Sequence, residues 1–516
     1  MNNLFLLSID STAKTFSVVD AGTTVNYELT VTNSAIPTIA VGDELIGFVS
    51  QGRNEFQSCY RVNAINGSTL QLVKVIERLK GISVAQYLPK IADAINALLS
   101  GSDVVGVDHD VAVEIRNAVV KGTDAELMPV HAKQVEELVL KAFLDLFKNT
   151  ILSTGLKYSD SMLRRFVSAL LAKPFVVLTG LSGSGKTKLA EAFVRWICEK
   201  DPKRWRIVPI GADWTDSQKL LGFPNALDDE RYILPDTQVL QMLIDADKDP
   251  DNPYFLILDE MNLSVVERYF ADFLSTMESS SAQFNLYDGD KRFADSEKKK
   301  EIPPTLKFPK NLFVIGTMNV DETTHMFSPK VLDRAQVIEF RVTKDDMNAY
   351  LDGDSVVDLD KLHDPNGNGK GCQYAKAFLT AAKSAFKQND AAKTALKTFF
   401  PKLADISTEF GFRTASECIR FASIYVTAGG VENEAVDLAI MHKLLPKVHG
   451  SRRKLAKPLE ALWSLCLNDG RTETLSDFFK GAADIKTVCK YPISAEKITR
   501  LYSAAETNGF ASYAEA

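Results

Sequence analysis

The segment "LTGLSGSGKTKLAEAF", residues 178–193, directly follows the apolar run "PFVVL" in the middle of a 516-residue chain. It predicts a buried strand, a glycine-rich loop and a helix. Gly180, Gly185, Lys186 and Thr187 match the pattern G-x-x-x-x-G-K-[ST]. The N–H groups of such a loop, together with the positive end of the following helix, bind phosphate. The segment therefore predicts a nucleotide site within an α/β domain.

The residues of this loop have separate expected roles. Lys186 is expected to reach the β and γ phosphates of a nucleoside triphosphate, and the Thr187 hydroxyl is expected to hold Mg²⁺. The residues predicted to contact nucleotide here are Gly180, Ser182, Gly183, Ser184, Gly185, Lys186 and Thr187.

A second strand, "PYFLILDEMNLS" at 253–264, ends in two acidic residues. Asp259 is expected to support Mg²⁺, and Glu260 to polarise the attacking water. A third apolar strand, "NLFVIGTMN" at 311–319, ends in Asn319, which is expected to orient that water. The alternative for Asn319 is a turn former at a strand end. Together these strands predict nucleotide hydrolysis rather than binding alone.

Composition limits the class of protein. The net charge of −7 gives no general reason to expect nucleic-acid binding, so any DNA contact must come from a local patch. The six cysteines are scattered without a C-x-x-C pair, which argues against a disulfide framework or a zinc site. The start "MNNLFLLSIDSTAK" lacks the features of a signal peptide, and no apolar run approaches 18 residues. A cytoplasmic protein without a membrane partner is predicted.

The pattern along the chain predicts four regions. Residues 1–82 alternate apolar and polar residues in short segments, as in a small β-barrel. Residues 83–155 have helical periodicity and are predicted to form a connector, 156–343 alternate strands and helices, and 344–516 are helical. The charged stretch "DGDKRFADSEKKKE" at 288–301 is predicted to be a solvated loop, with Lys298, Lys299 and Lys300 as alternative DNA-backbone contacts. We assign no nuclease centre to the chain.

The order of the motifs resembles that of the AAA+ superfamily, and in particular of the McrB-type motors of modification-dependent restriction systems. The resemblance covers about residues 160–455 and rests on the phosphate loop, "LDEMN", "GTMN" and "SPKVLDRA". It implies an ATP- or GTP-driven ring, usually a homo-hexamer, that acts on double-stranded DNA in antiviral defence with a separate McrC-like nuclease subunit. Asp321 and Glu322 follow the asparagine where such motors couple hydrolysis to that partner, although the commonest form has an arginine after the aspartate.

The same resemblance implies roles for two arginines. Arg334 matches the arginine finger that one subunit inserts beside the γ-phosphate of its neighbour. Arg413, near the start of a helix in the C-terminal lid, matches a second sensor that touches nucleotide, with Arg420 as its rival. The basic cluster "KLLPKVHGSRRKL" at 443–455 either contacts DNA phosphates or is a solvated loop.

The N-terminal region resembles the EVE or PUA-like barrels fused to some McrB-type motors, which hold an extruded, modified base in an aromatic pocket. The available rings are Phe48, Phe56 and Tyr60, with Arg53 and Arg61 as phosphate contacts. Alternatively these rings form the barrel core. A second function also stays open, in which a remodelling chaperone acts on a protein complex and uses this domain as a protein adaptor. The sequence leaves open whether ATP or GTP is used and which modification, if any, is read.

Overall fold

The computed structural model describes residues 131–513 with short gaps, and of the chain before them only strand residues between 4 and 106. The chain divides into two compact units, Met1–Val139 and Leu140–Ala516. Each unit is described by itself.

The first unit contains a six-stranded sheet with the order β2-β5-β4-β3-β1-β6. Its neighbouring strands are antiparallel except for β1 and β3, which are parallel. The short strand β6 lies within the range predicted to be helical and pairs with β1. The side chains of Phe48, Arg53, Phe56, Tyr60 and Arg61 lie outside the described residues, so the closed barrel and its aromatic pocket stay predictions. The strands are β1 (Leu4–Ser8), β2 (Thr24–Glu28), β3 (Glu44–Val49), β4 (Glu55–Asn66), β5 (Thr69–Ser83) and β6 (Val104–Gly106).

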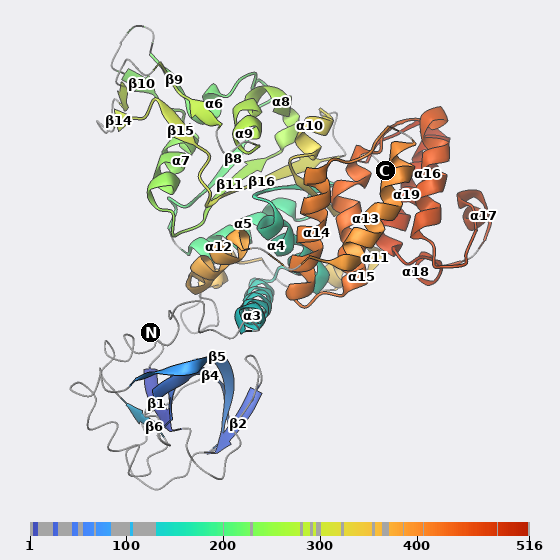
Figure 1. Ribbon diagram of the computed structural model, residues 1–516. Helices are drawn as coiled ribbons and strands as arrows, with labels where there is room; N and C mark the ends of the chain where they lie inside the picture. Colours follow the sequence, from blue (N-terminus) through green and yellow to red (C-terminus); the bar gives the residue numbers. More distant parts are fainter. Residues whose placement is uncertain are drawn as a thin grey trace. The chain divides into compact units, whose positions relative to one another are not determined.

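The second unit is built on a five-stranded sheet with the order β17-β7-β16-β11-β8. Its strands β16, β11 and β8 are labelled in Figure 1. Every pair of neighbours in it is parallel. The predicted parallel α/β sheet is therefore confirmed, and β16 lies between the strands that carry the phosphate loop and the acidic pair. The strands are β7 (Phe175–Gly180), β8 (Trp205–Pro209), β11 (Tyr254–Asp259), β16 (Leu312–Asn319) and β17 (Gln336–Phe340).

Both faces of this sheet are covered, which explains why its strands are nearly continuous apolar runs. Along β7, Val176 and Leu178 face one hydrophobic core, whereas Phe175 and Val177 face the other. The first core includes α4 (Asp160–Ala172), α5 (Lys186–Cys198) and helices from the C-terminal region. The second core includes α6 (Gln218–Leu221), α7 (Val239–Lys248), α8 (Val266–Tyr269) and α9 (Ala271–Thr276).

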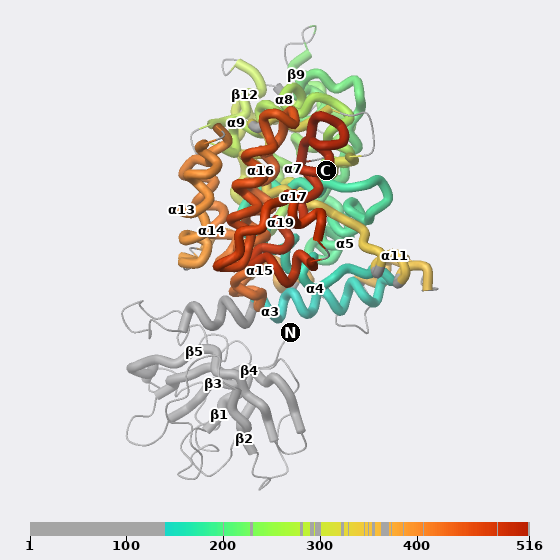
Figure 2. The backbone as a smooth tube through the Cα atoms, turned by 90° about the vertical axis from the view of Figure 1, so that its right-hand side faces the viewer, coloured from blue at the N-terminus to red at the C-terminus, as the bar shows by residue number. Residues whose placement is uncertain are grey.

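Helices follow the last strand of the sheet, as predicted for residues 344–516. Figure 2 shows α14, α15, α16 and α19 packed beside one another. They share one core with α3 (His131–Ser153), α4 and α5, so the helical region is joined to the sheet by buried apolar contacts. The helices are α11 (Lys344–Leu351), α12 (Ala375–Lys383), α13 (Asp390–Ala404), α14 (Phe412–Thr427), α15 (Glu432–Lys443), α16 (Arg452–Cys466), α17 (Leu475–Lys480), α18 (Ile485–Val488) and α19 (Pro492–Asn508).

The charged insertion between β11 and β16 differs from the predicted loop. Strands β12 (Gln283–Asn285) and β15 (Thr305–Lys307) pair antiparallel, and so do β13 (Phe293–Asp295) and β14 (Glu301–Ile302). Phe284, Ile302 and Leu306 are buried in the core that covers one sheet face, which gives these strands a hydrophobic anchor. Within 288–301 the solvated-loop prediction is therefore wrong for the strand residues Phe293–Asp295 and Glu301, while Lys298, Lys299 and Lys300 lie outside the described residues.

A buried ion cluster fixes the last helix to the edge strand of the sheet. Glu339 on β17 accepts from Lys497 Nζ at 2.9 Å and from Arg500 Nη1 at 2.8 Å and Nη2 at 2.9 Å. Burial alone would raise the pKa of Glu339, but the hydrogen bonds and positive charges of Arg500 and Lys497 outweigh it and lower the pKa to about 2.

We predict that E339Q lowers the free energy of unfolding by about 3 kcal/mol at neutral pH, because it removes the carboxylate charge that pairs with the buried Lys497. Since the folded pKa lies below the ordinary value of 4.5, the stabilisation is complete above about pH 4.5 and is lost as the pH falls towards 2. Urea unfolding at several pH values measures this. The difference in unfolding free energy between the wild type and E339Q should shrink as the pH falls below 4.5. A difference that stays constant down to pH 2 would contradict the prediction. E473Q, which removes an exposed ion pair with Arg471, is the control.

Candidate active site

The loop between β7 and α5 holds its shape through glycines in backbone conformations that other residues rarely adopt. Gly180 has φ +151° and Gly185 has φ +91°. A Cβ on Gly180 would lie 2.3 Å from the carbonyl oxygen of Phe340, so no side chain fits where β7 meets β17. The predicted strand, loop and helix are present, with Ser182, Gly183 and Ser184 in the loop itself.

Lys186 points into the loop from the first turn of α5. Its ammonium donates to the carbonyl oxygens of Gly180 at 2.9 Å and Leu181 at 2.6 Å. The side chain is buried, so its charge is concentrated at the place where the loop would surround a phosphate.

Tyr158, which the sequence analysis did not single out, also contacts the loop. Its hydroxyl donates to the carbonyl oxygen of Gly185 at 2.9 Å. Burial raises the pKa of Tyr158, so it stays a neutral donor. No motif signals this residue, because it precedes α4 and is 27 positions from its partner.

The acidic strand β11 meets the loop at the carboxyl edge of the sheet. Thr187 Oγ1 donates to Asp259 Oδ1 at 2.7 Å, and Thr317 Oγ1 on β16 donates to the same oxygen at 2.7 Å. The sequence analysis included Thr317 within "GTMN" but gave it no role. Its hydroxyl also accepts from Glu260 N at 2.9 Å, so one threonine positions both acidic residues.

Glu260 and Asn319 lie within hydrogen-bond distance of each other. Asn319 Nδ2 donates to Glu260 Oε1 at 3.1 Å. Glu260 has φ 56° and ψ 49°, a left-handed conformation that costs energy in a residue with a Cβ and is concentrated at functional sites. The buried Asn262 holds the backbone of Asn319 from both sides, donating to its carbonyl oxygen at 2.7 Å and accepting from its N–H at 3.3 Å.

The residues at this edge suit Mg²⁺. A threonine hydroxyl and a carboxylate oxygen, 2.7 Å apart, are hard oxygen ligands of the kind that Mg²⁺ prefers. Within the described residues no three His, Cys, Asp or Glu side chains form a closed metal site. A metal ion at this edge would be held by Thr187, with Asp259 beside it, and its coordination would be completed by substrate phosphates and water.

The two predicted arginines lie together, away from the loop. Glu278, just after α9, pairs with Arg334 through one carboxylate oxygen and with Arg413 Nη1 through the other, at 2.9 Å. Arg334 precedes β17, whose first residue Gln336 pairs with Val176 near the start of β7. Arg334 and Arg413 therefore lie near the amino ends of β7 and β17. The phosphate loop follows the carboxyl end of β7, at the opposite edge of the sheet.

The remaining predicted residues are divided among several places. Arg420, the rival of Arg413, donates to the carbonyl oxygens of Ser384 at 2.6 Å, Ala382 at 2.6 Å and Leu171 at 3.2 Å, and so binds the end of α12 and of α4. In the basic cluster, Lys447 pairs with Asp333 at 2.5 Å and Arg452 with Glu506 at 2.7 Å. Asp321 and Glu322 lie outside the described residues.

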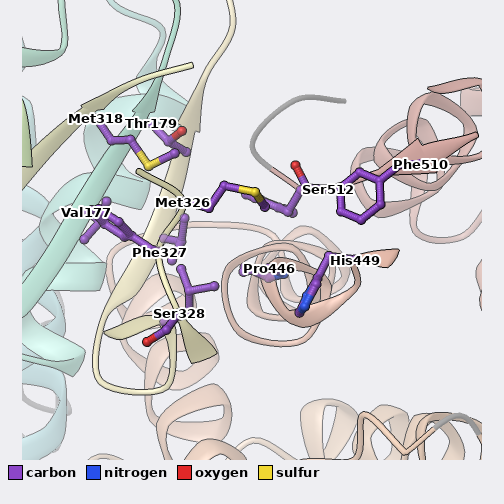
Figure 3. A pocket seen from close by; sticks show the side chains of 13 residues that line it. Val177, Thr179, Met318, Met326, Phe327, Ser328, Pro446, His449, Phe510 and Ser512 are labelled. Atoms are coloured by element: carbon purple, nitrogen blue, oxygen red, sulfur yellow. The ribbon is translucent and has the colours of Figure 1, made fainter. Parts of the chain in front are cut away.

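A cavity of about 300 Å³ lies beside this site, between the sheet and the C-terminal region (Figure 3). Its lining includes none of Lys186, Thr187, Asp259 and Glu260. The cavity is therefore lined by other side chains than those predicted to hold the phosphates and the metal. Its lining comes from Val177, Thr179 and Met318 on the strands, from Met326, Phe327, Ser328 and Leu332 after β16, from Val337 on β17, and from Pro446, His449, Phe510, Ser512 and Tyr513.

Comparison with known proteins gives a match to one family model and similarities to solved structures. A family model described as a domain of unknown function, DUF8727, matches residues 366–510. No curated protein matches the chain. A candidate ATPase from Cytophaga hutchinsonii is similar with a TM-score of 0.38 and 14% identity, over 60% of this chain and 88% of the other. The S. cerevisiae Hsp104–ADP complex is similar with a TM-score of 0.25 and 16% identity, over 62% of this chain and 57% of the other.

Among the described residues, no helix combines the length and the apolar character needed to cross a membrane.

Proposed function

We propose that the chain is an AAA+ nucleoside triphosphatase that hydrolyses ATP or GTP with Mg²⁺ and works as a ring, most simply a homo-hexamer. One observation carries this proposal: the hydrogen bond between Asn319 and Glu260, beside the Thr187–Asp259 contact, at the end of the sheet that bears the phosphate loop. A site for binding alone needs the loop, but not a carboxylate and an amide arranged around the position of a water molecule.

The side chains divide the reaction into three tasks. The loop N–H groups and Lys186 hold the phosphates, and bound Mg²⁺ offsets their negative charge. Glu260 accepts a proton from water as the water oxygen attacks the γ-phosphorus, and Asn319 orients that water by its amide. The bond from phosphorus to the bridging oxygen breaks, which leaves a nucleoside diphosphate and inorganic phosphate.

We further propose that the enzyme is the motor subunit of a McrB-type restriction complex that recognises double-stranded DNA and recruits an McrC-like nuclease subunit. The order of the motifs between residues 160 and 455 supports this assignment. The separate N-terminal unit with its six-stranded sheet supplies a second module suited to target recognition. In a remodelling chaperone the same unit would instead be an adaptor for a protein substrate. The cytoplasmic location also stays a prediction.

Hydrolysis of ATP and GTP by the full chain, with and without duplex DNA, tests the proposal. We expect Mg²⁺-dependent turnover, and we expect base-modified duplex to bind more tightly than unmodified duplex at one fixed salt concentration, because a pocket for a flipped base selects by its shape and by contacts to the exocyclic groups of that base. Absence of turnover with both nucleotides would contradict the enzyme proposal. Turnover with equal affinity for both duplexes, or with no DNA binding, would contradict the reader role and favour the chaperone.

A further inference from the structure

The inference concerns Arg413, Arg334 and the carboxylate that joins them, and it rests on the proposed nucleotide hydrolysis. The resemblance to AAA+ motors implies that Arg413 touches nucleotide, and the side-chain contacts indicate in which subunit. Each oxygen of Glu278 pairs with one of the two guanidinium groups, so Arg413 lies beside Arg334.

The position of α14 shows which end of the sheet these arginines occupy. Glu417, one helical turn after Arg413, forms a largely buried ion pair with Lys173, which lies two residues before β7. Glu417 also pairs with Lys443 at 2.7 Å, and Lys443 donates to the carbonyl oxygen of Ala335 at 2.9 Å, just before β17. The helix is thus tied to the amino ends of two parallel strands.

The length of β7 then separates Arg413 from the phosphate loop of its own subunit. Six residues from Phe175 to Gly180 span about 16 Å at 3.3 Å per step, and Lys173 lies before the first of them. An arginine side chain does not bridge that distance. If Arg334 or Arg413 contacts a phosphate from this end of the sheet, that phosphate is therefore bound to another copy of the chain.

We propose that Arg413 is a second catalytic arginine that acts on the neighbouring subunit's nucleotide together with Arg334, and that Glu278 is the residue that positions the pair. Two guanidinium groups repel each other, and the carboxylate between them offsets this repulsion. A guanidinium group has five N–H donors, and the contact with Glu278 uses only some of them in each arginine. The other donors can therefore face a phosphate.

The surface around the pair fits a second copy of the chain. Phe412, adjacent to Arg413, is 96% exposed at the first position of α14. Exposed aromatic rings and arginines are enriched in protein interfaces, so this surface suits contact with a second copy of the chain. The two cations would then face the anionic nucleotide bound by the neighbouring subunit.

A mixing experiment separates action on the neighbour from action within one subunit. R413A should lower the turnover number about tenfold to a hundredfold with little change in KM for the nucleotide. Neither R413A nor K186A alone turns over well, but their mixture should regain activity, because a K186A subunit supplies Arg413 to the intact loop of an R413A neighbour. If R334A regains activity with K186A while R413A does not, Arg413 acts within its own subunit and the inference is wrong. If the wild type hydrolyses neither nucleotide, the proposed function itself fails instead.

The role of Glu278 needs a separate variant. E278Q keeps the shape but removes the charge between the arginines, so we expect about a tenfold lower turnover number, an unchanged melting temperature and no further loss when R334A and R413A are already present. E473Q is a matched control, since its ion pair with Arg471 is equally exposed. A faster E278Q enzyme would mean that Glu278 restrains the arginines, and a loss that adds fully to that of R334A and R413A would mean that it acts elsewhere. Either result would overturn this role.

Discussion

Replacing Lys186 by Ala should abolish nucleotide binding, whereas E260Q should keep nucleotide bound and stop its hydrolysis. The buried ammonium of Lys186 lies at the carbonyl oxygens of Gly180 and Leu181, where the loop would surround a phosphate. Removing such a charged partner costs about 2–5 kcal/mol, so the affinity should fall about 30-fold to several thousand-fold. Glu260 contacts Asn319 and not the loop, so its loss should lower the turnover number by about 10²–10⁴ without weakening binding.

Titration with a fluorescent nucleotide and a phosphate-release assay measure the two effects separately. Lys188 and Glu191 lie on the same helix α5, where they pair with each other at 3.0 Å, and Lys188→Ala and E191Q are therefore matched controls that should bind and hydrolyse like the wild type. Hydrolysis by E260Q at the wild-type rate would show that another group accepts the proton. Binding by K186A at the wild-type affinity would move the phosphate site elsewhere.

The parts of the site that a sequence predicts are those whose residues are neighbours in the chain. Gly180, Gly185, Lys186 and Thr187 belong to one loop, where backbone conformation and residue type depend on each other. Asp259 and Asn319 follow apolar runs, and parallel strands bring their carboxyl ends to one edge, so their proximity follows from the strand pattern.

The parts that the sequence did not predict depend on contacts between distant segments. Thr317 is 58 positions from Asp259, and Glu278 is 135 positions from Arg413. A hydrophobic period of two residues indicates a strand and one of 3.6 residues a helix, but neither period specifies which distant residue a side chain contacts. The insertion strands were missed for a related reason: they are only two or three residues long, and their apolar residues find a core supplied by other elements.

The position of Arg334 leads to a second prediction with a large expected effect. R334A should lower the turnover number by about 10³-fold or more, as loss of an arginine finger does in related enzymes, because its positive charge no longer offsets the negative charge of the transition state. Nucleotide binding to the subunit's own loop should be nearly unchanged, since Arg334 lies near the amino end of β17, whereas the loop follows the carboxyl end of β7.

Mixing R334A with K186A subunits tests whether the arginine acts between copies. The R334A subunit keeps an intact loop and the K186A subunit keeps an intact arginine, so active sites form only where unlike subunits meet in the right order. Activity should therefore rise from near zero in either pure variant to a maximum at an intermediate mixing ratio. R471A, which removes an exposed arginine paired with Glu473, should hydrolyse normally and so report any general effect of losing a surface cation. A mixture that stays inactive at every ratio, although it assembles, would place the action of Arg334 within its own subunit.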